Sequence, residues 1–194
     1  MTPLLSMLTG ARAFGFGLFR GESYTPEGSA YEIAKYVVPS GDIASVIFSI
    51  PSGYRHIRFE ISCQNSSSSN SSGWLVGNFN NDTTSSYSYH ILSGSGSSAS
   101  SSGGLTSAPI FGDINNNGSG SSIFAPSVID LVDYNSMSKY KTFKVLTGFD
   151  NNSWGEMYSV TGNWRSLEPI TSVKFYVSSY NIKANSTFTM IGYK

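Results

Sequence analysis

The sequence predicts an all-β protein: an antiparallel β-sandwich or barrel, preceded by an extended N-terminal segment. Apolar residues recur at every second position in about ten short segments, which is the period of a half-buried strand. Clusters of Gly, Pro, Asn and Ser separate these segments at regular spacing. No segment alternates a strand with a long helix, so a parallel sheet is not expected. The chain has 194 residues, enough for one domain with its own core.

The clearest strand is "HIRFEISC", residues 56–63. Ile57, Phe59, Ile61 and Cys63 fall on one face and polar residues on the other, as in a half-buried antiparallel strand. The same alternation predicts strands in "IASVIFSI", "YKTFKVLTGF", "TSVKFYVSS" and "STFTMIGY". Further strands are expected at "EIAKYVV", "GWLVGNF", "SSYSYHI", "SVIDLVDY" and "EMYSV". Cys63 is the single cysteine, and we expect it to be buried and structural.

Other segments leave alternatives open. "GSAYEIAKYVV", residues 28–38, fits helical spacing, but its β-branched end and Pro39 fit a strand as well. "PIFGDI" leaves room for a short helix. The low-complexity stretches 62–73 and 93–104 are interpreted as long surface loops that join paired strands and have mobile tips. A domain boundary at either stretch would leave pieces too small to own a core.

The chain is therefore divided into an N-terminal arm with the first strand, residues 1–40, and a β-sandwich domain, residues 41–194. In "ARAFGFGLFRGESYTPEG" the aromatic residues Phe14, Phe16 and Phe19 are spaced by glycine and cannot form a core alone. Such a segment is either an edge strand on the sandwich or an arm that docks on a neighbouring chain, and we favour the arm. The three phenylalanines are the candidate contacts with a neighbouring chain.

Composition excludes several classes of function. Only 12% of residues are charged and the formal net charge is zero, so no clustered basic surface for nucleic acid is expected. No apolar run approaches about 20 residues, so no membrane span is expected. The N-terminal "MTPLLSMLTGARA" lacks basic residues before its interrupted apolar run, so we expect no secretory signal. A nearly neutral surface resists self-association poorly and favours a protein that associates.

The sequence offers no catalytic constellation. His90 lies in "SYSYHIL" with Ser88 on the same strand face, a pattern that a serine-rich chain produces by chance. Asp130 and Asp133 are three apart and should point to opposite faces of a strand, so they do not form a carboxylate pair. "DINNNGSG" lacks the closing acid of a calcium loop and is interpreted as an Asn-Gly turn. We predict no catalytic residue, no metal and no cofactor, and we do not expect an enzyme.

Trp154 and Trp164 are the candidate surface-binding aromatics. They flank "GEMYSVTGN", interpreted as a hairpin that would present the two indoles as a platform for stacking sugars. The alternative, which we favour, is that both tryptophans cap the ends of the sandwich core.

The order of four segments resembles a β-domain that recurs in virion proteins of tailed bacteriophages. The segments are "SIPSGYRHIRFEISC", "GNFNNDTTSSYSYHILSGSG", "VIDLVDYNSMSKYKTFKVLTG" and "TGNWRSLEPITSVKFYVSSYNIKANSTFTMIGYK". The similarity covers about residues 45–194 and consists of strand signatures in a common order, without a catalytic motif. The long Ser/Gly stretches depart from the pattern.

The resemblance implies a jelly-roll-like sandwich in a phage particle, of the kind found in head decoration (cement) proteins and in tail fibre or spike tips, which are commonly trimeric. We therefore expect a capsid decoration protein that stabilises the head shell. The alternative is a tail fibre, knob or spike component that contacts the host surface. The expected partners are other copies in a homotrimer and the major capsid protein or another virion protein, with Phe14, Phe16 and Phe19 as the candidate subunit or capsid contacts. The expected location is the virion, with synthesis in the host bacterial cytoplasm.

Overall fold

The structure, a computed structural model, describes residues 30–68, 73–116, 118, 120, 122–152 and 154–194. Phe14, Phe16 and Phe19 of the expected arm lie outside the described residues. The strands, in chain order, are β1 (Ala30–Val37), β2 (Ser45–Ser49), β3 (His56–Cys63), β4 (Gly73–Phe79), β5 (Tyr87–Gly94), β6 (Ala99–Thr106), β7 (Ile110–Ile114), β8 (Ala125–Val132), β9 (Lys141–Asp150), β10 (Gly155–Trp164), β11 (Ser172–Val177) and β12 (Thr187–Tyr193).

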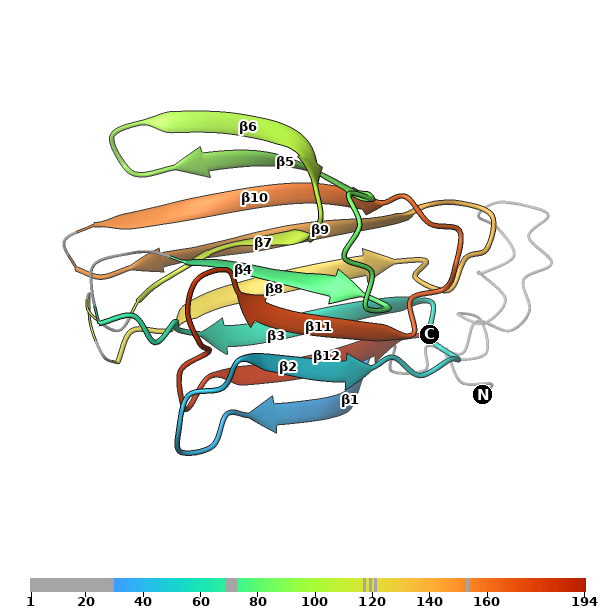
Figure 1. Cartoon of the computed structure of the whole chain (residues 1–194), viewed down its shortest axis with the longest axis horizontal. Helices are drawn as coiled ribbons and strands as arrows, with labels where there is room; N and C mark the ends of the chain where they lie inside the picture. Colours follow the sequence, from blue (N-terminus) through green and yellow to red (C-terminus); the bar gives the residue numbers. More distant parts are fainter. Residues whose placement is uncertain (1–29, 69–72, 117, 119, 121, 153) are drawn as a thin grey trace, which may run out of the picture.

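These strands form two antiparallel sheets packed face to face (Figure 1). The larger sheet has eight strands in the order β1-β12-β3-β8-β9-β10-β5-β6, and the smaller has four in the order β2-β11-β4-β7. The all-β antiparallel sandwich predicted from the sequence is confirmed. The described residues contain no helix, and so none that is long and apolar enough to cross a membrane.

Four of the strand pairs are nested in sequence. The first strand of the described chain pairs with the last (β1 with β12), β2 pairs with β11, β3 with β8 and β4 with β7. The pairs alternate between the two sheets, so the chain behaves as one long hairpin that is rolled up. β1, which the sequence analysis grouped with the arm, is thus an edge strand of the sandwich itself.

Two further strand pairs lie outside this nested scheme. β5 and β6 are inserted between β4 and β7, and β9 and β10 between β8 and β11. Both insertions join the larger sheet, where β9 pairs with β8, β10 with β9, and β5 with β10. The larger sheet therefore extends past the smaller one and ends in the edge strand β6, which is exposed along nearly its whole length.

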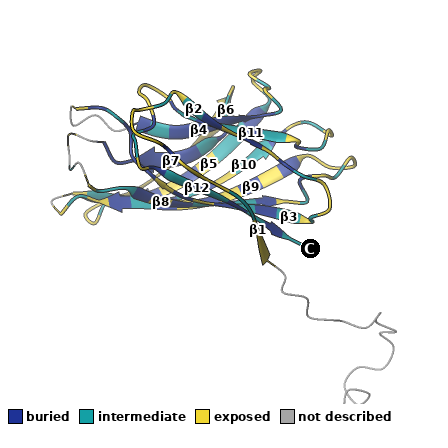
Figure 2. Cartoon of the chain, turned by 90° about the horizontal axis from the view of Figure 1, so that it is seen from below, coloured by how far each residue is buried: buried dark blue, intermediate teal, exposed yellow. Residues whose placement is uncertain are grey.

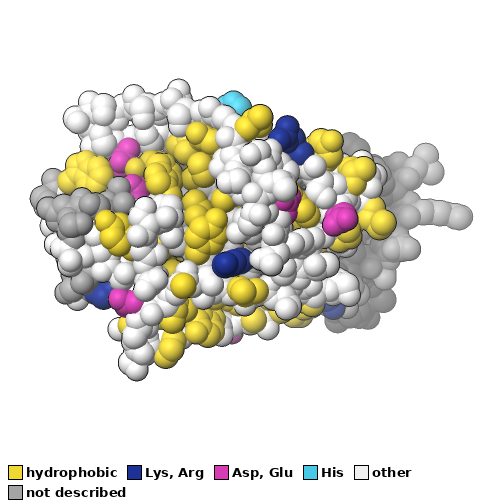
Figure 3. All heavy atoms as spheres, in the orientation of Figure 1, with side chains coloured by type: hydrophobic (Ala, Val, Ile, Leu, Met, Phe, Trp, Pro, Cys, Tyr) yellow, Lys and Arg dark blue, Asp and Glu magenta, His cyan; other side chains and the backbone are white. Residues whose placement is uncertain are grey.

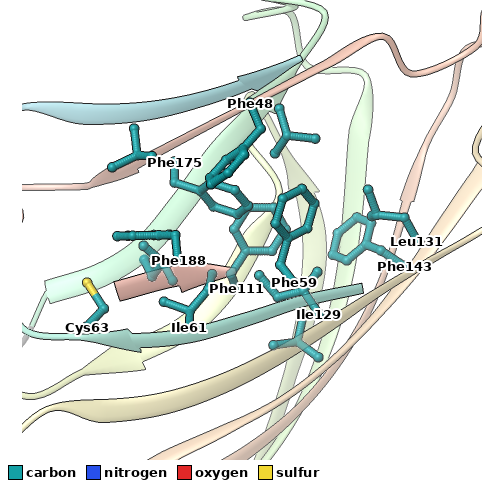
Figure 4. Packing of buried hydrophobic residues seen from close by; sticks show 14 of the residues in the cluster. Phe48, Phe59, Ile61, Cys63, Phe111, Ile129, Leu131, Phe143, Phe175 and Phe188 are labelled. Carbon is teal, nitrogen blue, oxygen red and sulfur yellow. The ribbon is translucent and has the colours of Figure 1, made fainter. Parts of the chain in front are cut away.

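Aromatic residues from both sheets fill the core between the layers (Figure 4). The rings of Phe59 on β3 and Phe175 on β11 are 4.9 Å apart, and those of Phe48 and Phe59 are 5.4 Å apart. The Phe59–Phe175 pair is edge-to-face, and such a pair contributes about 0.5–1.5 kcal/mol beyond the area it buries. Along the strands buried residues alternate with more exposed ones (Figure 2). The inward phase is the one that the sequence predicted for "HIRFEISC".

Two segments that left room for a helix are strands. Residues 30–37 form β1, which pairs along β12. "PIFGDI" contains β7, which pairs with β4. In β7 the φ angle of Gly112 is 103°, and a Cβ there would stand 2.0 Å from the Thr147 side chain. Glycine thus lets β7 lie directly on β9, an approach that local periodicity does not reveal.

Both low-complexity stretches differ from the predicted surface loops. In residues 93–104, β5 and β6 form a regular hairpin, and only the short turn between Gly94 and Ala99 is a loop. Backbone pairing and a hydrogen bond of 2.8 Å between the Ser93 and Ser100 hydroxyls stabilise this hairpin. The stretch lacks the alternating apolar residues that would have indicated a strand. The stretch 62–73 connects two different sheets rather than paired strands. Its described part is largely buried, with Gln64 and Asn65 fully inaccessible.

Candidate functional site

The polar stretch 77–98 is a framework element in which Asp82 fixes the crossing from β4 to β5. The Asp82 carboxylate accepts hydrogen bonds from Ser86 Oγ at 2.5 Å, Thr84 Oγ1 at 2.7 Å and the Trp164 indole Nε1 at 2.7 Å. Burial opposes ionisation of this carboxyl, but these donors and the backbone N–H of Thr84 outweigh it and hold the pKa of Asp82 well below its usual range. A carboxylate bonded in this way is not available as a general base.

His90 lies on the outer face of the larger sheet, opposite Thr161 on β10 and Gly103 on β6. A Cβ on Gly103 would stand 2.8 Å from the imidazole, so the ring covers the glycine backbone of β6. A shallow hollow beside His90 includes Ser88 and Lys144 but no carboxylate. Among the described residues that line this hollow there is therefore no aspartate or glutamate to orient the imidazole, as a Ser-His-Asp triad requires.

Asp130 and Asp133 pair with different cations and do not form a carboxylate pair. Arg58 on β3 binds Asp130 through two hydrogen bonds of 2.7 and 3.0 Å. Asp133 lies just past the end of β8 and pairs with Lys139 and Arg55. Nowhere in the described part of the chain do three His, Cys, Asp or Glu side chains gather in a group that could hold a metal ion.

Cys63 at the end of β3 is fully buried, as predicted. Burial raises the pKa of its thiol to about 12. The residue is therefore an inert core side chain in the folded protein.

A buried polar cluster beneath the loops at one end of the sandwich was not predicted. The Gln64 amide nitrogen donates to the carbonyls of Asn116, Gly120 and Ile123 at 2.6–3.1 Å. Asn115, which is also buried, donates to the Ile123 carbonyl at 3.1 Å. These bonds tie the "DINNNGSG" segment to the chain that follows β3. The cluster is a structural brace, and its only signal in the sequence is the run of amide side chains.

The two candidate tryptophans lie at opposite ends of one strand. "GEMYSVTGN" is not a hairpin but part of β10, which runs unbroken from Gly155 to Trp164 and pairs throughout with β9. Trp164 is 2% exposed and packs on Phe79, so it belongs to the core and offers no binding surface. Trp154 is 47% exposed and stands edge-on to Phe149 at 5.0 Å. Only Trp154 can take part in surface binding.

Trp154 borders a groove at the end of the outer face of the larger sheet. The ends of β8, β9 and β10, the β5–β6 turn and residues 123–124 surround a hollow of about 1560 Å³. Leu146 and Met157, which lie in the outward phase of β9 and β10, are 51% and 62% exposed there. Figure 3 shows the other side of the sandwich, where the smaller sheet lies in front. Charged side chains are few and scattered on that side as well. Because contiguous exposed apolar surface marks interaction sites, this groove is the candidate functional site.

The sequence contains one indication of this groove that the prediction of strands did not use. In "YKTFKVLTGF" Phe143 and Val145 point inward, which leaves Leu146 in the phase that solvent normally occupies. An apolar residue in the outward phase of a strand indicates an uncovered hydrophobic position.

Comparison of the chain with protein-family models, with curated proteins and with solved structures found no significant match in any of the three.

Proposed function

We propose that this protein is a jelly-roll structural component of a tailed-phage virion and that it acts as a decoration protein on the capsid. The observation that carries the proposal is the nested pairing of β1 with β12, β2 with β11, β3 with β8 and β4 with β7. That arrangement, divided between two sheets, is the topology expected of a jelly roll, an architecture common in viral capsid proteins and also used by lectins and cupins. Because a fold alone does not define a function, we use the surface of the protein to choose among these functions.

The surface supports an associating structural protein. Cupin-type chemistry needs a metal-ligand cluster, and the described residues contain none. The outer face instead carries exposed apolar residues, including Leu92, Leu146 and Met157 at 51–62% exposure. With charged residues at 12% of the chain, such a face favours packing against another protein surface. Many modest contacts of this kind, repeated over a symmetric shell, stabilise it by multivalency.

The proposal is tested by adding the purified protein to capsids of the same phage assembled without it. Co-sedimentation should show saturable binding at a fixed ratio to the capsid subunit, and decorated heads should resist heating better than bare heads. A Leu146→Lys/Met157→Lys variant tests whether the outer face makes the contact, with Ile47→Lys on the smaller sheet as the matched exposed control. If the wild-type protein does not bind heads, the decoration role is wrong.

A second candidate function is contact with the host surface as part of a tail fibre, knob or spike. One observation favours it: Trp154 is 47% exposed beside Asp150, Asn152 and Glu156, a combination of a stacking surface and polar groups that suits sugars. Binding of labelled protein to host cells, lost in Trp154→Ala but kept in Leu105→Ala, would support this function. Equal binding by both variants would exclude Trp154 as the contact.

A further inference from the structure

The groove bordered by Trp154 has an apolar floor and an acidic rim. Leu146, Met157 and Phe124 supply apolar surface, and Trp154 closes one end. The charged residues that line it are Asp150 and Glu156, and neither Lys nor Arg is among the lining residues. Such a groove suits an apolar segment that carries positive charge.

Each carboxylate at the rim uses one oxygen within the chain. The Tyr158 hydroxyl donates to Glu156 at 2.6 Å, and the backbone N–H of Asn152 donates to Asp150 at 2.7 Å. The second oxygen of each can accept from a cation. In the β9–β10 register Gly155 lies opposite Asp150 and Glu156 opposite Phe149, so Asp150 extends from the outer face of the sheet and Glu156 from the inner face, and both line the groove near the β9–β10 turn.

The chain itself contains a segment with the complementary chemistry. Residues 12–20, "RAFGFGLFR", carry arginine at both ends, no acidic residue, and four large apolar residues between them. This segment precedes the described part of the chain, which begins at Ala30. We propose that residues 12–20 of one copy bind in the groove of a neighbouring copy.

The distance between Ala30 and the groove favours a segment from a neighbouring copy over the segment of the same chain. Ala30 lies in one cross-strand row with Tyr193, His56, Val132 and Thr142, at the end of the larger sheet away from the β9–β10 turn. From there the groove is about 13–27 Å along the strands and about 19 Å across four strand spacings. The nine residues between 20 and 30, if flexible, span only about 18 Å on average. If the segment bound the groove of its own chain, these nine residues would have to be stretched beyond their average span. Binding to a second copy does not impose this constraint.

The contact is head-to-tail, because the segment of one copy meets a different surface of the next. A head-to-tail contact makes a closed ring where its rotation closes, and a trimer is one such ring. The inference goes beyond the proposed function because it requires only copies of this chain and no virion. Failure of capsid binding would leave it intact, and its own failure would leave capsid binding intact.

The test uses cross-linking between two singly substituted full-length chains. Phe16→Cys protein is mixed with Leu146→Cys protein and treated with a mild oxidant, so that only two different copies can form the new disulfide. The native Cys63 is fully buried and stays out of the reaction while the protein is folded. Leu105→Cys, whose position on β6 is 65% exposed and outside the groove, replaces Leu146→Cys in the matched control.

The expected result is a dimer band in the Phe16→Cys with Leu146→Cys mixture, at least about tenfold stronger than in the control mixture. Glu156→Lys introduced into the Leu146→Cys chain should weaken it about tenfold, which corresponds to about 1.4 kcal/mol, and Arg12→Glu with Arg20→Glu in the Phe16→Cys chain should restore part of it. Equal bands in both mixtures would overturn the proposal. So would a disulfide that forms within a Phe16→Cys/Leu146→Cys double variant but not between mixed chains.

Discussion

The Trp164 indole Nε1 donates a 2.7 Å hydrogen bond to the Asp82 carboxylate, across 82 positions of sequence. Through this bond the end of β10 is fixed to the crossing between the two sheets, where Trp164 also packs on Phe79 and Tyr87. Trp164 stood out in the sequence as a candidate for surface binding. Together with Asp82 it forms a structural joint that closes one end of the core.

Breaking this joint should lower stability, whereas changing Trp154 should not. We expect Trp164→Phe to reduce the free energy of unfolding by about 1–3 kcal/mol, since it removes a donor to a charged acceptor while keeping most of the ring. Trp154→Phe, at 47% exposure, should change it by less than about 0.5 kcal/mol. Denaturant unfolding of both variants measures the difference. Equal effects would show that Trp164 does not hold Asp82.

The Asp82 joint also predicts a pH dependence. Its carboxyl has a lowered pKa in the folded protein, because hydrogen bonds from Ser86, Thr84 and Trp164 outweigh the cost of burial. An unfolded aspartate titrates near pH 3.9. The stabilisation is therefore fully present well above that pH and is lost as the pH falls through the folded-state pKa.

Asp82→Asn isolates this contribution. The variant should be less stable than the wild type at pH 7 by about 1–3 kcal/mol, and the gap should narrow as the pH is lowered below about 4. Unfolding curves recorded from pH 7 to pH 3 provide the measurement. A gap that stays constant over this range would contradict the assignment of the lowered pKa to Asp82.

Two glycines on the larger sheet should differ in how far their replacement by alanine lowers stability. At Gly162 an added Cβ would stand 1.9 Å from the Phe143 ring, whereas at Gly94 it would meet nothing within 4 Å. Overpacking of this kind costs about 1–3 kcal/mol, so Gly162→Ala should be clearly destabilised and Gly94→Ala close to neutral. Thermal unfolding of the pair checks this expectation. Similar melting temperatures would mean that Phe143 moves aside without cost.

The strand β6 can be tested separately because its sequence gives so little sign of it. Alternate backbone amides of Ala99–Thr106 should exchange slowly with solvent, since every second residue of an edge strand bonds to its neighbour, here β5. Residue-resolved hydrogen exchange by NMR measures this pattern. Uniformly fast exchange from Ser95 to Thr106 would instead indicate the mobile loop that the composition suggests.

The sequence predicted what depends on local alternation and missed what depends on distant contacts. Ile57, Phe59 and Ile61 point inward as their period requires, because one buried face imposes that period. β6 was missed because serine and glycine carry no hydrophobic period, and its register comes entirely from β5. β7 was missed because Gly112 is required by its close approach to Thr147, a residue 35 positions away in the sequence.

The candidate site shows the same division. The exposure of Trp154 and the burial of Trp164 depend on where β10 begins and ends, and a presumed hairpin obscured both. The apolar groove could have been found from Leu146, whose outward phase follows from Phe143 and Val145. Its acidic residues could not, since Asp150 and Glu156 come to the same end of the groove only when β9 and β10 pair.

The central claim is that this jelly-roll-like sandwich decorates a phage head, and electron cryomicroscopy of heads tests it most directly. Heads assembled without the protein are imaged alone and after incubation with it. We predict added density at symmetry-related positions on the outer shell, into which the eight- and four-stranded sheets fit. Heads that look identical before and after incubation would contradict it, as would density found only on the tail.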